Sequence, residues 1–283
     1  MRASTGRRTS PHQATADSAA GPAVGRAPLR LLLPALLGLG LLAFPLLSLL
    51  ARTPWTTMPA RLVEPKVLDA LWLSLLTSTI AMGLCLVLGL PLAWVLARLS
   101  FPGRSFLRGL VTVPLVLPPV VAGVALLTAF GRNGVLGGPL REVGISIPFT
   151  TTAVVIAHTF VALPFFVISV EGALRATNQD YDVVAATLGA DRWTIFRRVT
   201  LPLAFPGIVA GMVLGWARSL GEFGATITFA GNFPGTTQTM PLYVYEALQS
   251  DPDAALVLSV ILLLVSILVL ALLRERWLYS AVR

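Results

Sequence analysis

The stretch LVLSVILLLVSILVLALL, residues 256–273, decides the fold class of this chain. It carries no charged residue, and as a helix it is long enough to cross most of the hydrocarbon layer of a bilayer. A transmembrane β-strand would be a segment of about ten residues with alternating apolar and polar positions, which this stretch does not show. Because a backbone in lipid must satisfy its own hydrogen bonds, the stretch predicts a transmembrane helix.

The composition extends this prediction to the whole chain of 283 residues. Hydrophobic residues make up 55% of it, charged residues 12%, and the mean hydropathy is +0.81. Soluble domains carry roughly 25% charged residues, so we expect a membrane protein. We predict an all-α polytopic membrane protein with six transmembrane helices, at residues 29–50, 67–97, 106–130, 149–170, 205–230 and 254–273. Prolines in these stretches are expected to kink the helices without ending them; they are Pro91, Pro114, Pro118, Pro119 and Pro164.

The distribution of basic residues predicts the orientation. With the N-terminus in the cytosol, fifteen of the 21 Lys and Arg residues fall in inside segments and Arg218 falls in the fifth stretch. The outside segments hold only Arg52, Arg61, Lys66, Arg132 and Arg141. Because cytosolic loops are enriched in Lys and Arg, both termini are predicted to be cytoplasmic. The pI of about 10.9 then reflects topology, and we expect no nucleic-acid surface.

The ends of the chain differ in composition from the apolar core. Residues 1–28 are rich in Ser, Thr, Ala, Gly, Pro and Arg and predict a disordered cytosolic tail. An Arg-rich tail before an apolar run also resembles a signal peptide, but the run at 29–50 is longer than a signal core, so we expect a retained span. The transmembrane domain is therefore placed at 29–273, and 274–283 at a cytosolic C-terminal tail.

The longest inside segment reads EGALRATNQDYDVVAATLGADRWTIFRRVTLPLAFPG, residues 171–207. Its pattern predicts a helix up to Leu188, a turn at Gly189 and a second helix that begins at Asp191, whose side chain can cap it. Such a bent pair could seat in the groove of a partner protein. It could equally lie on the membrane with Arg197 and Arg198 toward lipid phosphates, and spacing alone does not separate these interpretations.

The same segment resembles the EAA loop of ABC-importer permeases, in which Glu-Ala-Ala precedes a glycine by three residues and Leu-Pro follows. Here the glycine is Gly189 and the Leu-Pro is Leu201-Pro202, whereas Val183 stands at the glutamate position, one residue after Asp182. The resemblance implies a type I ABC importer permease fold in which loop 171–206 docks on an ATP-binding subunit. The residues it assigns to this coupling are Asp182, Ala185, Ala186, Gly189, Ala190, Arg192 and Pro202.

Further stretches resemble the molybdate branch of these permeases. They are WARSLGEFGATITFAGNFPGTTQTMPLYVYEALQSDPDAALVLS (216–259), LVLPPVVAGVALL (115–127) and FGRNGVLG (130–137). The resemblance implies transport of molybdate, with tungstate as a second substrate, across a bacterial plasma membrane. It also implies a second copy of the chain, two cytosolic ATP-binding subunits, an extracytoplasmic molybdate-binding protein and surrounding lipid as partners. Sulfate or thiosulfate permeases, which share the Gly-Glu-Phe/Tyr-Gly pattern, are the alternative.

The fifth stretch contains the charged residues Arg218 and Glu222, four positions apart and so able to pair on one helix face. Charged groups inside a membrane are costly and face a cavity or the protein interior. We therefore predict a transport pathway or gate formed by Arg218, Ser219, Glu222, Phe223 and Thr226. The alternative is an ion pair that only joins two spans. His158 has no matching ligand cluster and is predicted to be a packed histidine.

Some activities are not expected from this sequence. It contains no Gly-x-x-x-x-Gly-Lys-Ser/Thr motif, so no ATPase site or bound cofactor of its own is predicted, and ATP must act through a partner. The single Cys85 and the distant His12 and His158 predict no metal site, and no catalytic set is present. Two other classes remain alternatives. An ion-coupled secondary transporter would need intramembrane carboxylates beyond Glu222, and an intramembrane enzyme would need more polar groups at membrane depth.

Overall fold

The computed structural model describes residues 29–178 and 180–278, and all regular elements within these ranges are helical, as predicted. The predicted disordered tail 1–28 lies outside the described residues. The chain forms two units, 1–51 and 52–283. In the first unit, the first predicted span is a single helix, α1 (Leu29–Arg52). All packing described below is within the second unit.

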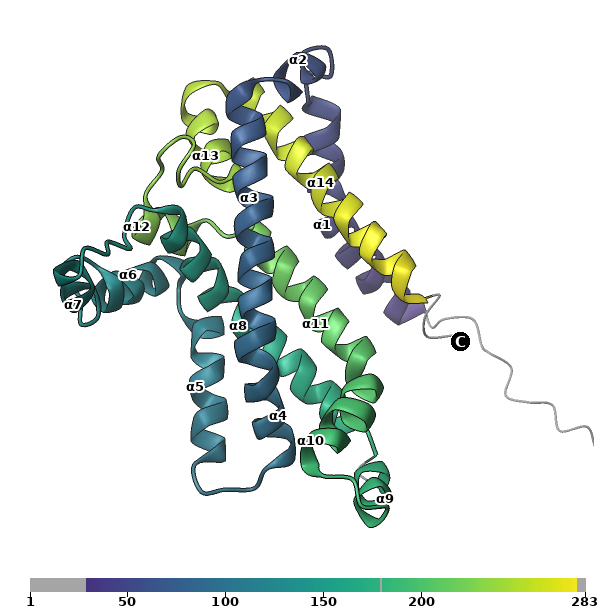
Figure 1. Ribbon diagram of the computed structural model, residues 1–283. Helices are drawn as coiled ribbons and strands as arrows, with labels where there is room; N and C mark the ends of the chain where they lie inside the picture. Colours follow the sequence, from purple (N-terminus) through teal and green to yellow (C-terminus); the bar gives the residue numbers. More distant parts are fainter. Residues whose placement is uncertain (1–28, 179, 279–283) are drawn as a thin grey trace, which may run out of the picture. The chain divides into compact units, whose positions relative to one another are not determined.

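The second unit contains thirteen α-helices and two π-helical turns in its described residues (Figure 1). The α-helices are α2 (Met58–Leu62), α3 (Pro65–Leu84), α4 (Leu90–Arg98), α5 (Arg104–Val116), α6 (Pro119–Phe130), α7 (Gly137–Glu142), α8 (Thr151–Ala176), α9 (Asp180–Thr187), α10 (Arg192–Ile195), α11 (Leu201–Leu220), α12 (Gly224–Ala230), α13 (Met240–Ser250) and α14 (Pro252–Leu278). The π-helical turns are η1 (Cys85–Gly89) and η2 (Phe196–Thr200).

Five continuous helical segments in the described ranges are long and apolar enough to cross a membrane. They are 31–52, 65–98, 151–176, 192–220 and 252–269. A sixth crossing is possible if the bent pair of α5 and α6 counts as one span. The all-α polytopic prediction is therefore confirmed, and α14 continues to Leu278, so the predicted tail 274–283 begins as helix.

The third predicted span is not one kinked helix, and that prediction is wrong. It consists of α5 and α6, whose axes differ in direction by 117°. Proline disfavours helical geometry in the residue before it and cannot donate a backbone hydrogen bond. Leu117 (ψ 131°) and Pro118 (ψ 137°) are accordingly extended, and Pro119 starts α6 at the first helical position, where no donor is needed.

The fifth predicted span is also placed differently. The prediction was 205–230, but the helix already begins at Arg192, passes through η2 and ends at Leu220. Residues 224–230 form the separate helix α12. The boundary arises because the Glu222 side chain accepts a hydrogen bond from the Ala225 N–H (2.9 Å), so it caps a new helix after the turn.

Both π-helical turns stand directly before a proline inside a long helix. η1 precedes Pro91 and η2 precedes Pro202 by the same two positions. Proline leaves the carbonyl four residues earlier without its usual donor. At η2 the Leu201 N–H donates to the Phe196 carbonyl five residues back, so the helix widens locally and continues. Each long helix therefore passes its proline without a break.

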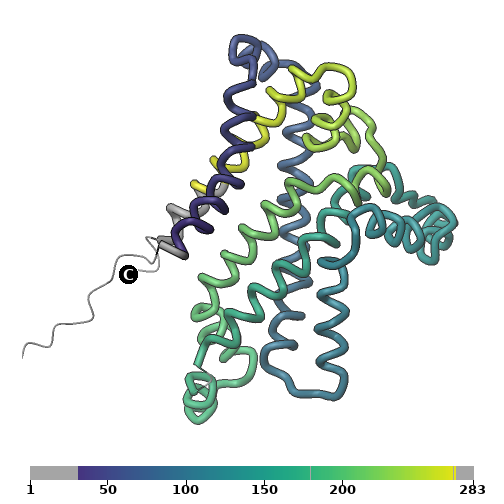
Figure 2. The backbone as a smooth tube through the Cα atoms, turned by 180° about the vertical axis from the view of Figure 1, so that it is seen from behind, coloured from purple at the N-terminus to yellow at the C-terminus, as the bar shows by residue number. Residues whose placement is uncertain are grey.

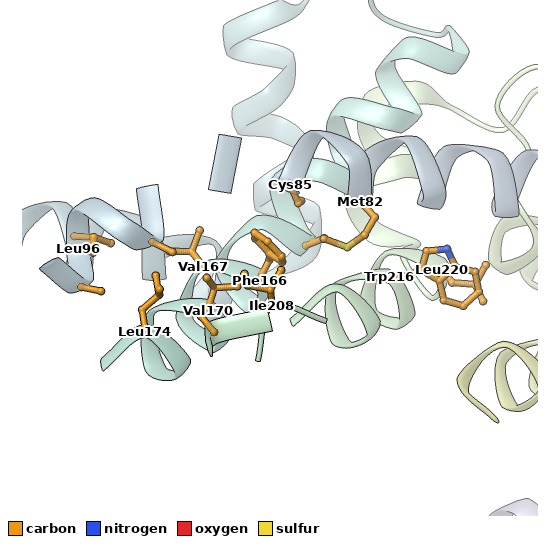
Figure 3. Close-up of a cluster of buried hydrophobic side chains, with 14 residues drawn as sticks. Met82, Cys85, Leu96, Phe166, Val167, Val170, Leu174, Ile208, Trp216 and Leu220 are labelled. Carbon is orange, nitrogen blue, oxygen red and sulfur yellow. The ribbon is translucent and has the colours of Figure 1, made fainter. Parts of the chain in front are cut away.

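The antiparallel helices α8 and α11 form the most extensive helix pair in the described chain, and they run side by side in Figures 1 and 2. Phe166, Val170 and Leu174 of α8 are completely buried and belong to one hydrophobic cluster with Ile208 of α11 (Figure 3). Glycines of α11 allow the close approach. A Cβ at Gly207 would overlap Ala173, and one at Gly215 would lie 3.1 Å from the Met82 sulfur of α3.

This packing predicts that Gly207→Val destabilises the protein by about 1–3 kcal/mol, because the new side chain would force α8 and α11 apart. Gly172→Val is the matched control, since a Cβ at that helical glycine meets nothing within 4 Å. The measurement is thermal unfolding of the purified protein, followed by tryptophan fluorescence. Equal melting temperatures for the two variants would contradict the close packing at Gly207.

Candidate functional site

The segment between α8 and α11 contains the bent helix pair α9 and α10, at the end of the second unit where α4 and α5 are joined (Figure 1). The turn between them is at Gly189, as predicted. Its φ of +87° is in the left-handed region, which favours glycine. The Gly189 N–H donates to Ala186 and the Ala190 N–H to Ala185, the paired bonds of a Schellman motif.

The second helix begins at Asp191, which caps it as predicted. The Asp191 Oδ2 accepts from the Trp193 N–H (3.2 Å). A hydrogen bond from the Thr194 hydroxyl, with smaller contributions from backbone N–H groups, holds the pKa of Asp191 below its usual range. A lowered carboxyl pKa means that the cap stabilises the helix above the pKa of the unfolded chain and is lost as the pH falls through the folded value.

The first helix of the pair presents apolar side chains to the surroundings. No residue of α9 is buried. Val183 is 61% exposed and Val184 is 56% exposed, and Leu188 just beyond the helix is 83% exposed. Ala186 is also exposed, whereas Ala185 is half-buried. An apolar surface on a helix at the rim of a protein indicates a contact with another molecule.

Asp182 holds the segment that contains α9 and α10, the predicted coupling segment, to the end of α4. Its Oδ2 lies 3.5 Å from Nη2 of Arg98, the last residue of α4, and its Oδ1 accepts from the Thr200 hydroxyl (3.1 Å). Aromatic rings add to this joint. Phe196 meets Trp94 of α4 edge-on at 6.1 Å between ring centroids and stacks on Trp193 at 5.6 Å. The carboxylate one position before the family's glutamate therefore braces α9 within the chain.

The structure brings most of the predicted coupling residues together. Asp182, Ala185, Ala186, Gly189, Ala190 and Arg192 all belong to the bent pair or its turn. Pro202 does not: it lies in the first turn of α11, beyond η2. Sequence reasoning missed Arg98 and Thr200, the partners of Asp182. Arg98 was counted only for orientation, and no pattern linked it to a segment more than eighty positions later.

A second charged cluster joins α5 to α8 near the same end. Glu171 is 6% exposed, and its Oε1 lies 2.6 Å from Arg108 Nη2 and 2.8 Å from Arg175 Nη2. Arg175 Nη2 also donates to the Leu96 carbonyl (3.3 Å). The predicted loop 171–206 thus begins too early, because α8 continues to Ala176 and Glu171 is part of that helix.

The predicted pair Arg218–Glu222 is formed. Arg218 Nη1 donates to Glu222 Oε2 at 2.7 Å. Glu222 stands in the turn after α11 and not on the helix itself, and it is 1% exposed. Its two oxygens therefore have separate partners, since Oε2 binds the last turn of α11 and Oε1 caps α12. The carboxylate joins two helices that meet at a sharp turn.

The predicted pathway residues other than Glu222 differ in exposure. Ser219 and Thr226 are both 0% exposed, and their hydroxyls, like both ring nitrogens of the 1% exposed His158, have no hydrogen-bond partner in the described chain. The Arg218 side chain is 32% exposed, and Phe223 packs on Tyr245 at 4.9 Å between ring centroids. Only Arg218 and Phe223 therefore reach the surface of this single chain. Among the described residues no group of three His, Cys, Asp or Glu is arranged to hold a metal.

Most of the chain is similar in sequence to permease proteins of transport systems. Residues 86–283 match the family described as binding-protein-dependent transport system inner membrane component. The molybdenum transport system permease protein ModB of Mycobacterium tuberculosis is 52% identical over 237 residues, which cover 84% of this chain and 90% of that protein. The sulfate transport system permease protein CysT of Escherichia coli K12 is 37% identical over 222 residues, covering 78% of this chain and 80% of that one.

The fold is similar to that of solved ABC transporters. A crystal structure of a bacterial transporter that imports the acidic polysaccharide alginate superposes with a TM-score of 0.69 at 19% identity, covering 88% of this chain and 93% of that chain. The same transporter in complex with its alginate-bound periplasmic protein gives 0.67 at 20% identity, covering 87% and 92%. At these identities the comparison concerns the fold, which is that of a type I importer permease.

The geometry at Glu222 predicts different effects for two substitutions. Glu222→Gln loses the ion pair with Arg218, but its amide oxygen can still accept from the Ala225 N–H. Glu222→Ala loses both partners, so it should be less stable than Glu222→Gln by about 1 kcal/mol, the usual contribution of a helix cap. Thermal unfolding of the two purified variants measures the difference. If the alanine variant were as stable as the glutamine variant, Glu222 would not cap α12.

Proposed function

This chain belongs to the family of binding-protein-dependent transport system inner membrane components, and from that premise we propose that it is the transmembrane permease subunit of an ATP-driven ABC importer that moves molybdate into the cytoplasm. The similarity that supports molybdate is the 52% identity to ModB over most of both chains. Sulfate is the second candidate because CysT is also similar, although at 37% identity. We expect tungstate to follow the same pathway as molybdate.

The observation that carries the coupling role is the exposed bent pair α9 and α10. Its apolar residues Val183, Val184 and Leu188 have no cover within the described chain. The sequence contains no phosphate-binding loop, so the energy of ATP must come from another subunit. An amphipathic helix that presents its apolar face can dock in a groove of such a subunit. In the complete importer, two ATP-binding subunits would bind the bent pairs of two copies of this chain.

The structure offers a direct mechanical path from this docking surface to the membrane. The helix that begins at Arg192 continues through η2 to Leu220, and the Arg218–Glu222 pair stands at its far end. A displacement of α10 would therefore move the turn at Glu222, which carries α12. Nucleotide-driven closure of the ATP-binding subunits would bias the importer between two such arrangements.

The pathway role of this turn follows from exposure. Arg218 and Phe223 can face the central pathway between two copies of the chain, where a guanidinium would attract an oxyanion. Ser219, Glu222 and Thr226 are buried, so in the proposed gate they would support Arg218 and Phe223 without contacting the anion. A secondary transporter would need a carboxylate free to bind a coupling ion, whereas Glu222 is engaged by Arg218 and the Ala225 N–H.

The remaining partners complete the proposal. The family's description implies a separate binding protein, and the alginate transporter has been crystallised with its periplasmic protein. We propose that an extracytoplasmic molybdate-binding protein delivers the anion to the face opposite α9 and α10. Both termini would lie in the cytoplasm, the chain would sit in the bacterial plasma membrane among its lipids, and it would bind no cofactor of its own.

We predict that Gly189→Glu weakens the hold on the ATP-binding subunit. A non-glycine residue at φ +87° costs about 1–2 kcal/mol, and the charge would be buried in the docked interface. Gly103→Glu is the matched control, because Gly103 has φ +93° in a loop at the same end and, like Gly189, has open space around its Cβ position. The measurement is co-purification of the ATP-binding subunit with each variant, together with molybdate uptake.

Co-purification and uptake should fall together for Gly189→Glu and stay near wild type for Gly103→Glu. If Gly189→Glu retains the ATP-binding subunit and transports normally, α9 and α10 form a surface anchor and do not couple ATP to transport. If both variants lose the subunit equally, backbone strain or charge at that face is responsible and not the bent pair.

The substrate is tested in cells that lack this chain. Uptake of labelled molybdate at low concentration should fall at least tenfold below that of complemented cells, since passive entry of a dianion through lipid is negligible. Sulfate uptake, measured in parallel, should not change. Normal molybdate uptake together with lost sulfate uptake would show that the chain is the permease of a sulfate importer.

A further inference from the structure

A cavity of about 330 Å³ lies between the end of α4 and the coupling segment. Arg98, Asp182, Arg192 and Thr200 provide its polar lining, and Trp94 and Phe196 provide aromatic walls. Two arginines face one carboxylate, so the lining has an excess positive charge. Asp182, Val183 and Arg192 of its lining also belong to the predicted coupling residues or the proposed docking surface, but the docking proposed above does not fill the cavity itself.

Arg98 has side-chain donors that the described chain leaves without an acceptor. Its side chain is 8% exposed, and one nitrogen, Nη2, lies 3.5 Å from Asp182. Its Nε and Nη1 are buried without a hydrogen-bond acceptor in the described chain. Buried donors of a charged group are costly when unpaired. Asp182 serves neither of them, since it approaches Arg98 only at Nη2. The guanidinium therefore requires an acceptor with several oxygens, such as a phosphate.

A second cavity, of about 350 Å³, adjoins the first and is almost entirely apolar. It shares Trp94, Arg192 and Phe196 with the first cavity and adds Pro91 and Trp193. Trp193 is 65% exposed and stacks on Phe196, so the groove is open along an aromatic wall. The two cavities together present a cationic end beside an apolar groove.

The two cavities lie at the end of a candidate membrane span. Arg98 is the last residue of the helical segment 65–98, and Pro91 and Trp94 belong to its last two turns. Tryptophan and arginine at such a level typically lie among lipid headgroups. Basic pockets between transmembrane helices on the cytoplasmic side recognise anionic headgroups. A free oxyanion or an acidic side chain of a partner would fill the first cavity only. The apolar side chains of the second cavity would then remain exposed.

We propose that the two cavities together bind one anionic phospholipid. Its phosphate pairs with the Arg98 guanidinium, whose side chain turns to bring the now buried Nε and Nη1 to the cavity, and it is neutralised further by Arg192. One acyl chain lies along Pro91, Trp94 and Trp193. The lipid thereby connects α4 to α10 and strengthens the joint that Asp182 makes between the span and the coupling segment. This site is independent of the transported substrate, and a failure of the molybdate assignment would leave it untouched.

The test uses the purified importer, with its ATP-binding subunit, in detergent. It is incubated with equal amounts of dioleoyl phosphatidylglycerol and dioleoyl phosphatidylcholine, washed, and the retained lipids are counted by native mass spectrometry. The wild type should retain one phosphatidylglycerol per permease chain. Arg98→Gln and Arg192→Gln should each bind it about tenfold more weakly, the usual effect of losing a hydrogen bond to a charged group. Arg197→Gln, an exposed arginine of η2 outside both cavities, is the charge-matched control and should retain the lipid.

Two further measurements separate the possible ligands. Trp193→Ala keeps both arginines and does not disturb a buried ion pair, so it tests the groove even if Arg98→Gln fails to fold; it should also lower retention. Inorganic phosphate or soluble glycerophosphoglycerol should not displace the lipid at equal concentration. Displacement by either, equal retention of phosphatidylcholine, or normal retention by both Arg192→Gln and Trp193→Ala would overturn the proposal.

Discussion

Backbone hydrogen bonding around proline determines how two long helical segments of this chain continue and why its third predicted span is bent. In a membrane an unpaired peptide group costs several kcal/mol, so each proline must be accommodated locally. Before Pro91 and Pro202 the helix widens into a π-helical turn and goes on. At Pro118 and Pro119 two adjacent prolines leave no helical alternative, and α5 and α6 meet at 117°. One constraint thus produces both the long helix from Arg192 to Leu220 and the broken third span.

The proposed coupling depends on these two outcomes. Because the helix does not break at Pro202, α10 and α11 form one continuous helical segment that ends just before the turn at Glu222. The short helices α6 and α12 pack on each other, with the Cβ position of Gly224 2.5 Å from Pro119 Cβ. A movement of α11 would therefore carry α12 and α6 together. Glu222 joins the parts through two hydrogen bonds, so both oxygens of this buried carboxylate have a partner.

Local signals in the sequence predicted the turn and the helix cap of the segment between α8 and α11 correctly. Gly189 was predicted to turn the chain and Asp191 to cap the next helix, and both residues do so through bonds to their near neighbours. The pairing of Arg218 with Glu222 was predicted from their spacing. The same spacing wrongly implied that both stand on one helix, because the capture of the Ala225 N–H by Glu222 depends on how α12 packs against α6 and α8.

The sequence by itself determined the fold class, the number of apolar stretches, and the turn and cap of the coupling segment, since hydropathy and helix capping act over a few residues. Its motifs also indicated the family. Only the tertiary structure decided that Asp182 binds Arg98, that Glu171 belongs to α8 and binds Arg108, and that Ser219 and Thr226 are buried. These contacts join helices that are far apart along the chain. Which side chains meet there is determined by the close packing of α3, α8 and α11 and by the bends at proline, and neither is encoded at a fixed spacing.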